Sequence, residues 1–252
     1  MSRILALSSL LLLTPAALIA QNASLEPSAT LPVDFTRSVD AGHAKVGDVV
    51  EAKTIQRVKL SDGSFLPAGA HVTGHVVEAN GFTFDKTPYA KQSGSTLSVR
   101  FDNLQSGSIS IPLHVTVRAI ADEFASSSAY APLSNDLDSR NARTLVGGDQ
   151  LYASQDGIEN MEGDIVAYNR RDGVYAHLIP NGSCDGGSTE VSMGIYSASA
   201  CGVYGFTGMR AAETGSVTNP STLTFVATRR SAEIPKHSTA LLEVLPAQQA
   251  SR

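Results

Sequence analysis

The clearest structural signal in the chain is STLSVRFDNLQSGSISIPLHVTVRAIA, residues 95–121. From Leu97 to Phe101, and again from Ile109 to Val117, every second residue is apolar. A period of two is typical of strands that bury one face and expose the other. The stretch therefore predicts a long antiparallel hairpin that covers a hydrophobic core.

Further strands are predicted on both sides of this hairpin. Residues 31–80 contain short apolar runs separated by turn residues, and Asp62-Gly63 marks a second tight hairpin. Alternation returns at 221–230 and 239–245. Only 17% of the residues are charged and 21 of the 252 are glycine, a composition that favours strands and turns. We therefore predict a mainly β fold, an antiparallel β-barrel or a sandwich-like domain.

The strand pattern breaks after residue 121. Residues 122–164 are rich in Ser, Asn, Asp and Gly. A loop as long as 122–219 without structure of its own is unusual in a compact domain. We predict that residues 122–219 form a partly folded insertion closed by a disulfide. The barrel-like domain then consists of residues 31–121 plus 220–246, and we expect residues 21–30 and 247–252 to be flexible.

One segment of the predicted domain resembles a known family. Within residues 46–80, the sequence VGDVVEAKTIQRVKLSDGSFLPAGAHVTGHVVEA resembles the β-barrel segment of conjugation and type IV secretion channel proteins. The resemblance is carried by five residues: Gly47, Leu66, Pro67, Gly69 and Gly74. It covers about 35 residues, extends at most to residue 120, and implies a β-barrel on the far side of the inner membrane. It does not imply a pore.

The N-terminus predicts the compartment. Residues 1–20 combine a basic Arg3, an apolar run and small residues that lead to Ala20, which is the layout of a secretory signal peptide. We expect an exported protein, periplasmic or extracellular, with no stable membrane span after cleavage. The alternative is that the same segment is kept as an uncleaved anchor.

The charge of the chain limits the kinds of partner that it can bind. The chain has 19 basic and 24 acidic residues, a formal net charge of −5, and no run of Lys or Arg. This balance argues against non-specific binding to nucleic acid or to anionic lipid. We expect no nucleic-acid partner and no cofactor. A partner would be an envelope protein or an extracellular ligand that binds through the insertion.

The two cysteines allow two interpretations. Cys184 lies in Gly182-Ser183-Cys184-Asp185-Gly186, a G-x-C-x-G pattern like the nucleophile elbow of hydrolases. In that case Glu233 and His237 are candidate partners in a triad. The segment after Cys184 makes a poor helix, however, and the chain lacks the alternating β–α units that support an elbow. In an exported chain with only two cysteines, a disulfide between Cys184 and Cys201 is favoured.

Tyrosines mark a candidate binding surface. Six of the seven tyrosines lie in the predicted insertion among Ser, Gly and Asn, a mixture typical of binding surfaces. We single out Tyr175, Tyr196 and Tyr204; the alternative is that they form a small core of the insertion. The acidic loop 135–142 lacks the ligands of a calcium site, and we expect no metal site.

These observations predict an exported, non-enzymatic β-barrel-like protein with a structural or binding role in the cell envelope. Two alternatives stay open. One is a cysteine-dependent hydrolase that uses residues 182–186. The other is a component of an envelope secretion or assembly complex.

Overall fold

The computed structural model describes residues 23–88, 91–130, 142–153, 157–170, 173–182, 184–216 and 219–246. The predicted signal peptide and the predicted flexible tail from 247 lie outside these residues, as does all but Ala142 of the loop 135–142. The described chain is mainly β and is built around one nearly closed, mixed, barrel-like sheet, which confirms the predicted fold class.

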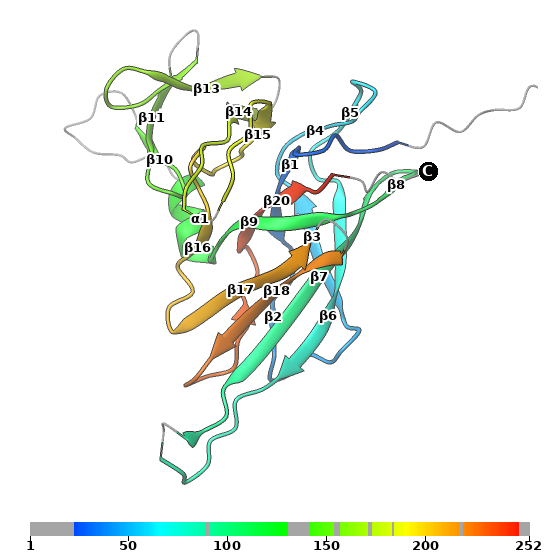
Figure 1. Cartoon of the computed structure of the whole chain (residues 1–252), viewed down its shortest axis with the longest axis vertical. Helices are drawn as coiled ribbons and strands as arrows, with labels where there is room; N and C mark the ends of the chain where they lie inside the picture. Colours follow the sequence, from blue (N-terminus) through cyan, green and yellow to red (C-terminus); the bar gives the residue numbers. More distant parts are fainter. Residues whose placement is uncertain are drawn as a thin grey trace, which may run out of the picture.

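Ten strands form the barrel-like sheet in the described part of the chain (Figure 1). Its order is β16-β9-β20-β1-β3-β6-β7-β18-β17, and β8 pairs with β7. All pairs are antiparallel except β16 with β9. The strands are β1 (Thr30–Phe35), β3 (Val49–Thr54), β6 (His71–Asn80), β7 (Ser95–Ser106), β8 (Ile109–Pro112), β9 (Val115–Ala121), β16 (Gly202–Tyr204), β17 (Met209–Ser216), β18 (Asn219–Ala227) and β20 (Thr239–Val244).

The alternation in residues 95–121 has the predicted effect. Leu97, Val99 and Leu104 of β7 are almost fully buried, as is Ile111 of β8 on the return. They join one core with apolar side chains of the other barrel strands. The largest fully buried members of this core are Leu31, Val33, Phe35, Leu97, Leu104, Ile120, Phe225, Ile234 and Leu242.

Two small two-stranded sheets contribute side chains to the barrel core. They pair β19 (Glu233–Ile234) with β2 (Val39–Asp40), and β4 (Val58–Lys59) with β5 (Phe65–Leu66). The β4–β5 turn contains Asp62-Gly63, with Gly63 at φ 83°, so the predicted hairpin signal is confirmed.

The insertion folds as a second sheet. Its six strands, in the described residues, follow one another in the order β10-β11-β12-β13-β14-β15 and lie above the barrel in Figure 1, beside helix α1 (Glu123–Tyr130). The strands are β10 (Arg143–Thr144), β11 (Gln150–Ala153), β12 (Ile158–Glu159), β13 (Ile165–Arg170), β14 (Gly173–His177) and β15 (Glu190–Ser192).

The insertion does not stand apart from the barrel. Its core contains Leu145, Met193 and Tyr196, and it also includes Ala119 of β9 and Leu241 of β20. Neighbouring residues of β9 and β20 therefore serve two cores, one inside the barrel and one under the insertion. This sharing explains why the chain from Val115 to Ala121 is buried on both faces near its end.

After the insertion, the chain returns to the barrel at an earlier residue than the sequence predicted. We predicted a boundary at residue 220, but β16 pairs with β9 and β17 pairs with β18, so residues from Gly202 onward belong to the barrel-like sheet. The separate sheet of the insertion ends with β15. The segment 209–216 lacks strong apolar alternation, which is why its strand was not recognised.

Gly74 provides a first test of the barrel packing. A Cβ atom at this position of β6 would overlap the backbone of Arg100 in β7. We expect Gly74→Ala to lower the free energy of unfolding by about 1–3 kcal/mol, because the backbone must shift. Gly187→Ala is the matched control, since its nearest neighbouring atom would be 4.0 Å away. Urea unfolding of both variants checks this, and equal effects would contradict it.

Candidate functional site at the junction of barrel and insertion

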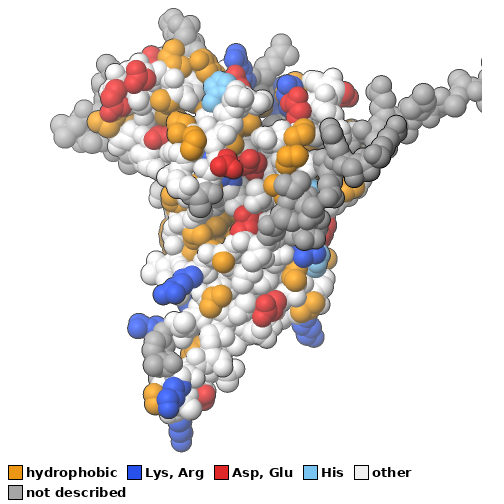
Figure 2. Space-filling view, viewed as in Figure 1, with side chains coloured by type: hydrophobic (Ala, Val, Ile, Leu, Met, Phe, Trp, Pro, Cys, Tyr) orange, Lys and Arg blue, Asp and Glu red, His pale blue; other side chains and the backbone are white. Residues whose placement is uncertain are grey.

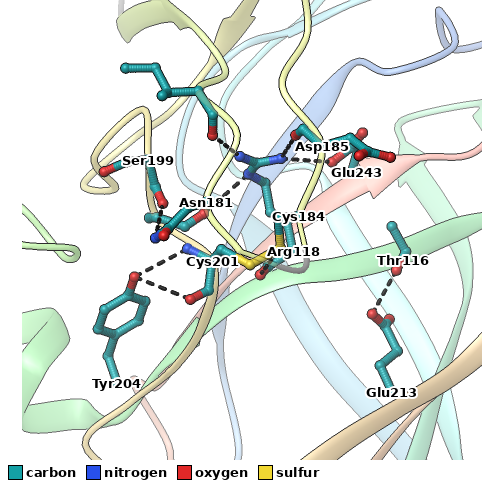
Figure 3. Close-up of a disulfide and its surroundings, with 12 residues drawn as sticks. Thr116, Arg118, Asn181, Cys184, Asp185, Ser199, Cys201, Tyr204, Glu213 and Glu243 are labelled. Carbon is teal, nitrogen blue, oxygen red and sulfur yellow. Dashed lines mark hydrogen bonds and ion pairs between the residues drawn. A yellow bond between two sulfur atoms is a disulfide. The ribbon is translucent and has the colours of Figure 1, made fainter.

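A disulfide closes the loop that follows β14. Cys184 and Cys201 are bonded, as predicted, with their Cα atoms 6.1 Å apart and a separation of 17 positions in sequence (Figure 3). Asn181 Nδ2 donates a hydrogen bond to Ser199 O at 2.9 Å and joins the same two segments. The loop is thus fixed at two neighbouring points, and Cys201 leads directly into β16 of the barrel.

Arg118 of β9 fastens this loop to the barrel. Its side chain is 1% exposed, and its guanidinium donates to three backbone carbonyl oxygens of the loop. They belong to Ile179 at 2.8 Å, Ala200 at 3.1 Å and Asp185 (Figure 3). Carbonyl groups removed from water need a hydrogen-bond donor, and the guanidinium of Arg118 supplies one to each of these three. Its hydrogen bonds thereby hold both ends of the disulfide-closed loop against one barrel strand.

Glu243 of β20 is the charged partner of Arg118. Its Oε2 lies 3.6 Å from Arg118 Nη1. Burial raises the pKa of Glu243 above its usual value, and the positive charge of Arg118 opposes this rise. The neighbouring carboxylates of Asp185 and Glu213 raise the pKa of Glu243 further. The junction therefore gathers more negative than positive charge in a half-buried setting.

Glu213 of β17 bridges the seam where the barrel sheet does not close by strand pairing. Its carboxylate accepts hydrogen bonds from Thr116 Oγ1 at 2.6 Å and from the backbone N–H of Val117, both in β9. It also accepts one from Ser221 Oγ of the adjacent β18. One side chain thus supplies the acceptors that a paired strand would otherwise offer to β9.

A substitution at Glu213 tests the seam. Glu213→Ala removes the acceptor of the Val117 N–H group, and we expect a loss of about 1–2 kcal/mol in the free energy of unfolding. Thr116→Val removes one of the hydrogen bonds and should cost less. Glu162→Ala, at an exposed residue of the insertion, is the control. Chemical denaturation of the three variants gives the comparison; a Glu213 variant as stable as the control would contradict the bridging role.

A pocket of about 500 Å³ opens at this junction. It is lined by the disulfide, by residues of β9, β17 and β20, and by the carboxylates of Asp185, Glu213 and Glu243. The guanidinium of Arg118 also lies at the pocket, but it is directed at three carbonyl oxygens. Glu213 already accepts hydrogen bonds from β9 and β18, and Glu243 is paired with Arg118. Three acidic residues nevertheless line the pocket against one basic residue, so it suits a cationic group better than an anion.

The three predicted tyrosines do not form one surface. Tyr196 is 0% exposed, its hydroxyl lies 2.7 Å from Thr239 Oγ1, and burial raises its pKa above the usual value. Tyr175 is also buried. The expectation of a binding surface at these two residues is thereby corrected: they pack inside the molecule because the insertion has few large aliphatic residues. Tyr204 is half-buried beside the disulfide, with its hydroxyl bonded to the backbone of Cys201.

The members of the hypothetical triad are placed in different surroundings. Cys184 is bonded to Cys201. Glu233 pairs with Asp40 in the two-stranded sheet of β19 and β2. His237 Nδ1 lies 3.5 Å from Asp34 Oδ1, beside helix α1 and away from the junction pocket.

Sequence reasoning missed Arg118, Glu213 and Glu243. Only Arg118 left a signal, because it is the one charged residue in a mostly apolar run, VTVRAIA. A charged residue in a strand that is buried on both faces requires polar partners, but the sequence does not say which ones. The partners are backbone carbonyls about 61 to 82 residues away, which no local pattern reveals.

Neither a metal cluster nor a membrane-spanning helix was found in the described ranges. There, no group of three or more His, Cys, Asp and Glu residues has the arrangement needed to hold a metal ion. Over the same residues, no helix has both the length and the apolar character required to cross a membrane. No protein-family model, curated protein or solved structure matches this chain.

Proposed function

We propose that this chain is an exported, non-enzymatic binding protein of the cell envelope, in which the barrel holds the insertion as one rigid body. The observation that carries the proposal is the disulfide at the junction, locked to the barrel by Arg118. Stable disulfides belong to oxidising compartments such as the periplasm and the extracellular space. A loop fixed in this way presents a pocket whose shape does not have to form upon binding, which favours affinity.

The junction pocket is the proposed binding site, and its ligand carries a positive charge. Acidic residues of three separate segments line it, and among them Asp185 is exposed. We expect small amines to raise the melting temperature of the protein, whereas acetate should not. Asp185→Asn is the variant to compare, because the fold uses the backbone carbonyl of Asp185 and not its carboxylate. Amine binding that the variant leaves unchanged would exclude this site.

Export and the state of the cysteines are tested together by intact mass. We expect protein from its native compartment to lack residues 1–20 and to take up two iodoacetamide groups only after reduction and unfolding. Alkylation of the native protein without reductant would show a free thiol. That result would contradict the proposal and favour the hydrolase alternative, with Cys184 as nucleophile and Cys184→Ser as the next variant.

A relationship to the barrel of conjugation and type IV secretion channels is a second proposal. What supports it is the barrel-like sheet together with the glycines of the resembling segment. Gly47 and Gly69 have φ angles of 92° and 86°, which favour glycine, and Gly74 lies against the backbone of β7. Because these are structural needs of small barrels in general, they support common architecture more than common function. Stable co-purification with a large envelope complex would extend the relationship to function.

A further inference from the structure

A second surface lies at the opposite end of the molecule from the insertion. There the loop between β6 and β7 projects beyond the barrel, next to the end where β17 begins and β18 ends (Figure 1). We propose that this end, the basic tip, docks on an anionic phospholipid membrane. The basic tip is defined by Phe84, Lys86, Lys91, Arg210, Arg229 and Arg230.

The charge of the tip is opposite to that of the whole chain. The segments 81–94, 207–210 and 226–230 contain five of the 19 basic residues and only one of the 24 acidic residues, Asp85. Figure 2 shows Lys and Arg side chains gathered at this lower end. At physiological salt, charges act over about 8 Å, so a membrane that meets the tip senses its local charge and not the net charge of the chain.

Four of the five basic residues line two hollows that share Arg229. One, of about 680 Å³, is lined by Arg210, Arg229 and Arg230. The other, of about 450 Å³, is lined by Phe84, Lys86 and again Arg229, together with the one acidic residue of the tip, Asp85. Arg230 Nη2 donates to Thr207 O at 2.8 Å, which holds this guanidinium beside the first hollow. Guanidinium groups arranged in this way suit phosphate oxygens, the charged part of a phospholipid headgroup.

The loop that carries Phe84 is internally braced. Gln92 Nε2 donates to Thr87 O at 3.1 Å, and Thr87 N donates to Asp85 Oδ1 at 2.7 Å. At its base, Phe82 N donates to Ser231 Oγ at 3.0 Å. The single acidic side chain of the tip thus organises the turn at residues 85–87, and the exposed Phe84 and Lys86 lie at this turn.

Phe84 distinguishes a membrane from a soluble anion. Phe84 is 79% exposed and lines the same hollow as Lys86, on the loop that extends from the barrel. An exposed aromatic ring adds nothing to the capture of a soluble phosphate. It does stabilise attachment to a lipid bilayer, where aromatic side chains enter the headgroup region while lysines and arginines contact anionic lipids.

Sedimentation with lipid vesicles tests the proposal. We expect the full-length mature protein to bind phosphatidylcholine vesicles that contain about one-third phosphatidylglycerol, and to dissociate at high salt. Lys86→Gln with Lys91→Gln should weaken binding about 30-fold, since each basic residue near such a surface contributes about 1 kcal/mol. Phe84→Ser should also weaken it, by a factor that changes little with salt over the range in which the unchanged protein binds, because salt does not screen the contact of an apolar ring.

Matched variants at the other end of the molecule serve as controls. Lys53→Gln with Lys59→Gln makes the same change in charge, and Met161→Ser removes an exposed apolar side chain that is 68% exposed. These variants should bind as the unchanged protein does. The proposal fails if pure phosphatidylcholine vesicles bind equally well, or if the tip variants behave like the controls. It also fails if a single-stranded oligonucleotide displaces the protein and Phe84→Ser has no effect, because the tip then binds polyanions in general. None of these results depends on the junction pocket.

Discussion

Replacing Arg118 by methionine is expected to lower the free energy of unfolding by about 3–5 kcal/mol, the largest effect of any single substitution considered for this chain. Methionine fills much of the same volume but has no donors. The carbonyls of Ile179, Asp185 and Ala200 would lose their partner, and Glu243 would lose its counter-charge. Equilibrium unfolding in urea measures the effect.

The pH dependence of the stability of Arg118→Met distinguishes two effects of the substitution, the loss of the positive charge and the loss of the hydrogen bonds. In the folded protein the pKa of Glu243 already lies above its unfolded value, because burial outweighs the charge of Arg118. Without Arg118 the pKa of Glu243 rises further. Glu243 in the folded variant therefore takes up a proton more readily than Glu243 in the unfolded chain. The variant's deficit in stability should therefore shrink as the pH falls from neutral toward about 4.3, the usual pKa of glutamate.

Two other variants keep this prediction testable if the methionine variant does not fold. Arg118→Lys retains the charge but loses the planar fork, so we expect a smaller yet clear loss of stability. Arg37→Met removes an exposed arginine that lies 3.6 Å from Glu51, and should change stability by less than about 1 kcal/mol. If Arg118→Met is no less stable than Arg37→Met, Arg118 does not fasten the loop to the barrel.

Removing the disulfide should have the second largest effect. The double variant Cys184→Ser, Cys201→Ser opens a loop of 17 residues, and we expect it to be about 3 kcal/mol less stable. For a chain of this length, that corresponds to a fall in melting temperature of about 6–12 °C. The physical reason is that the unfolded chain regains the freedom that the bridge removed, while Arg118 and Asn181 still hold the folded loop.

Reductant provides the matched control for this loss. Reduction should lower the melting temperature of the unchanged protein to nearly that of the double variant, and should leave the variant unaffected. Limited proteolysis should then cut first within residues 179–189, whose described residues are mostly exposed, because residues 191–200 lie in the core of the insertion. A double variant as stable as the oxidised protein would mean that Arg118 and the packing around it suffice to hold the loop.

The elements that could be predicted from sequence depend on local patterns. Strands β7 and β8, the turn at Gly63 and the pairing of two cysteines follow from alternation, turn chemistry and the number of cysteines. Strand β17 was missed, because its position at the edge of the barrel does not require alternating apolar residues. Tyr175 and Tyr196 were expected at a surface, and they are buried because the insertion packs against β9 and β20.

The sequence by itself determined the mainly β fold and the disulfide. The alternation of apolar and polar residues is visible in neighbouring positions, and an exported chain with two cysteines is expected to pair them. Only the tertiary structure decided which polar groups meet. Arg118 reaches carbonyls far along the chain, and five basic residues from three segments gather at one end of an otherwise acidic protein. The physical reason is that charge and hydrogen bonds act through space over a few ångströms, whereas their order along the chain carries no record of that distance.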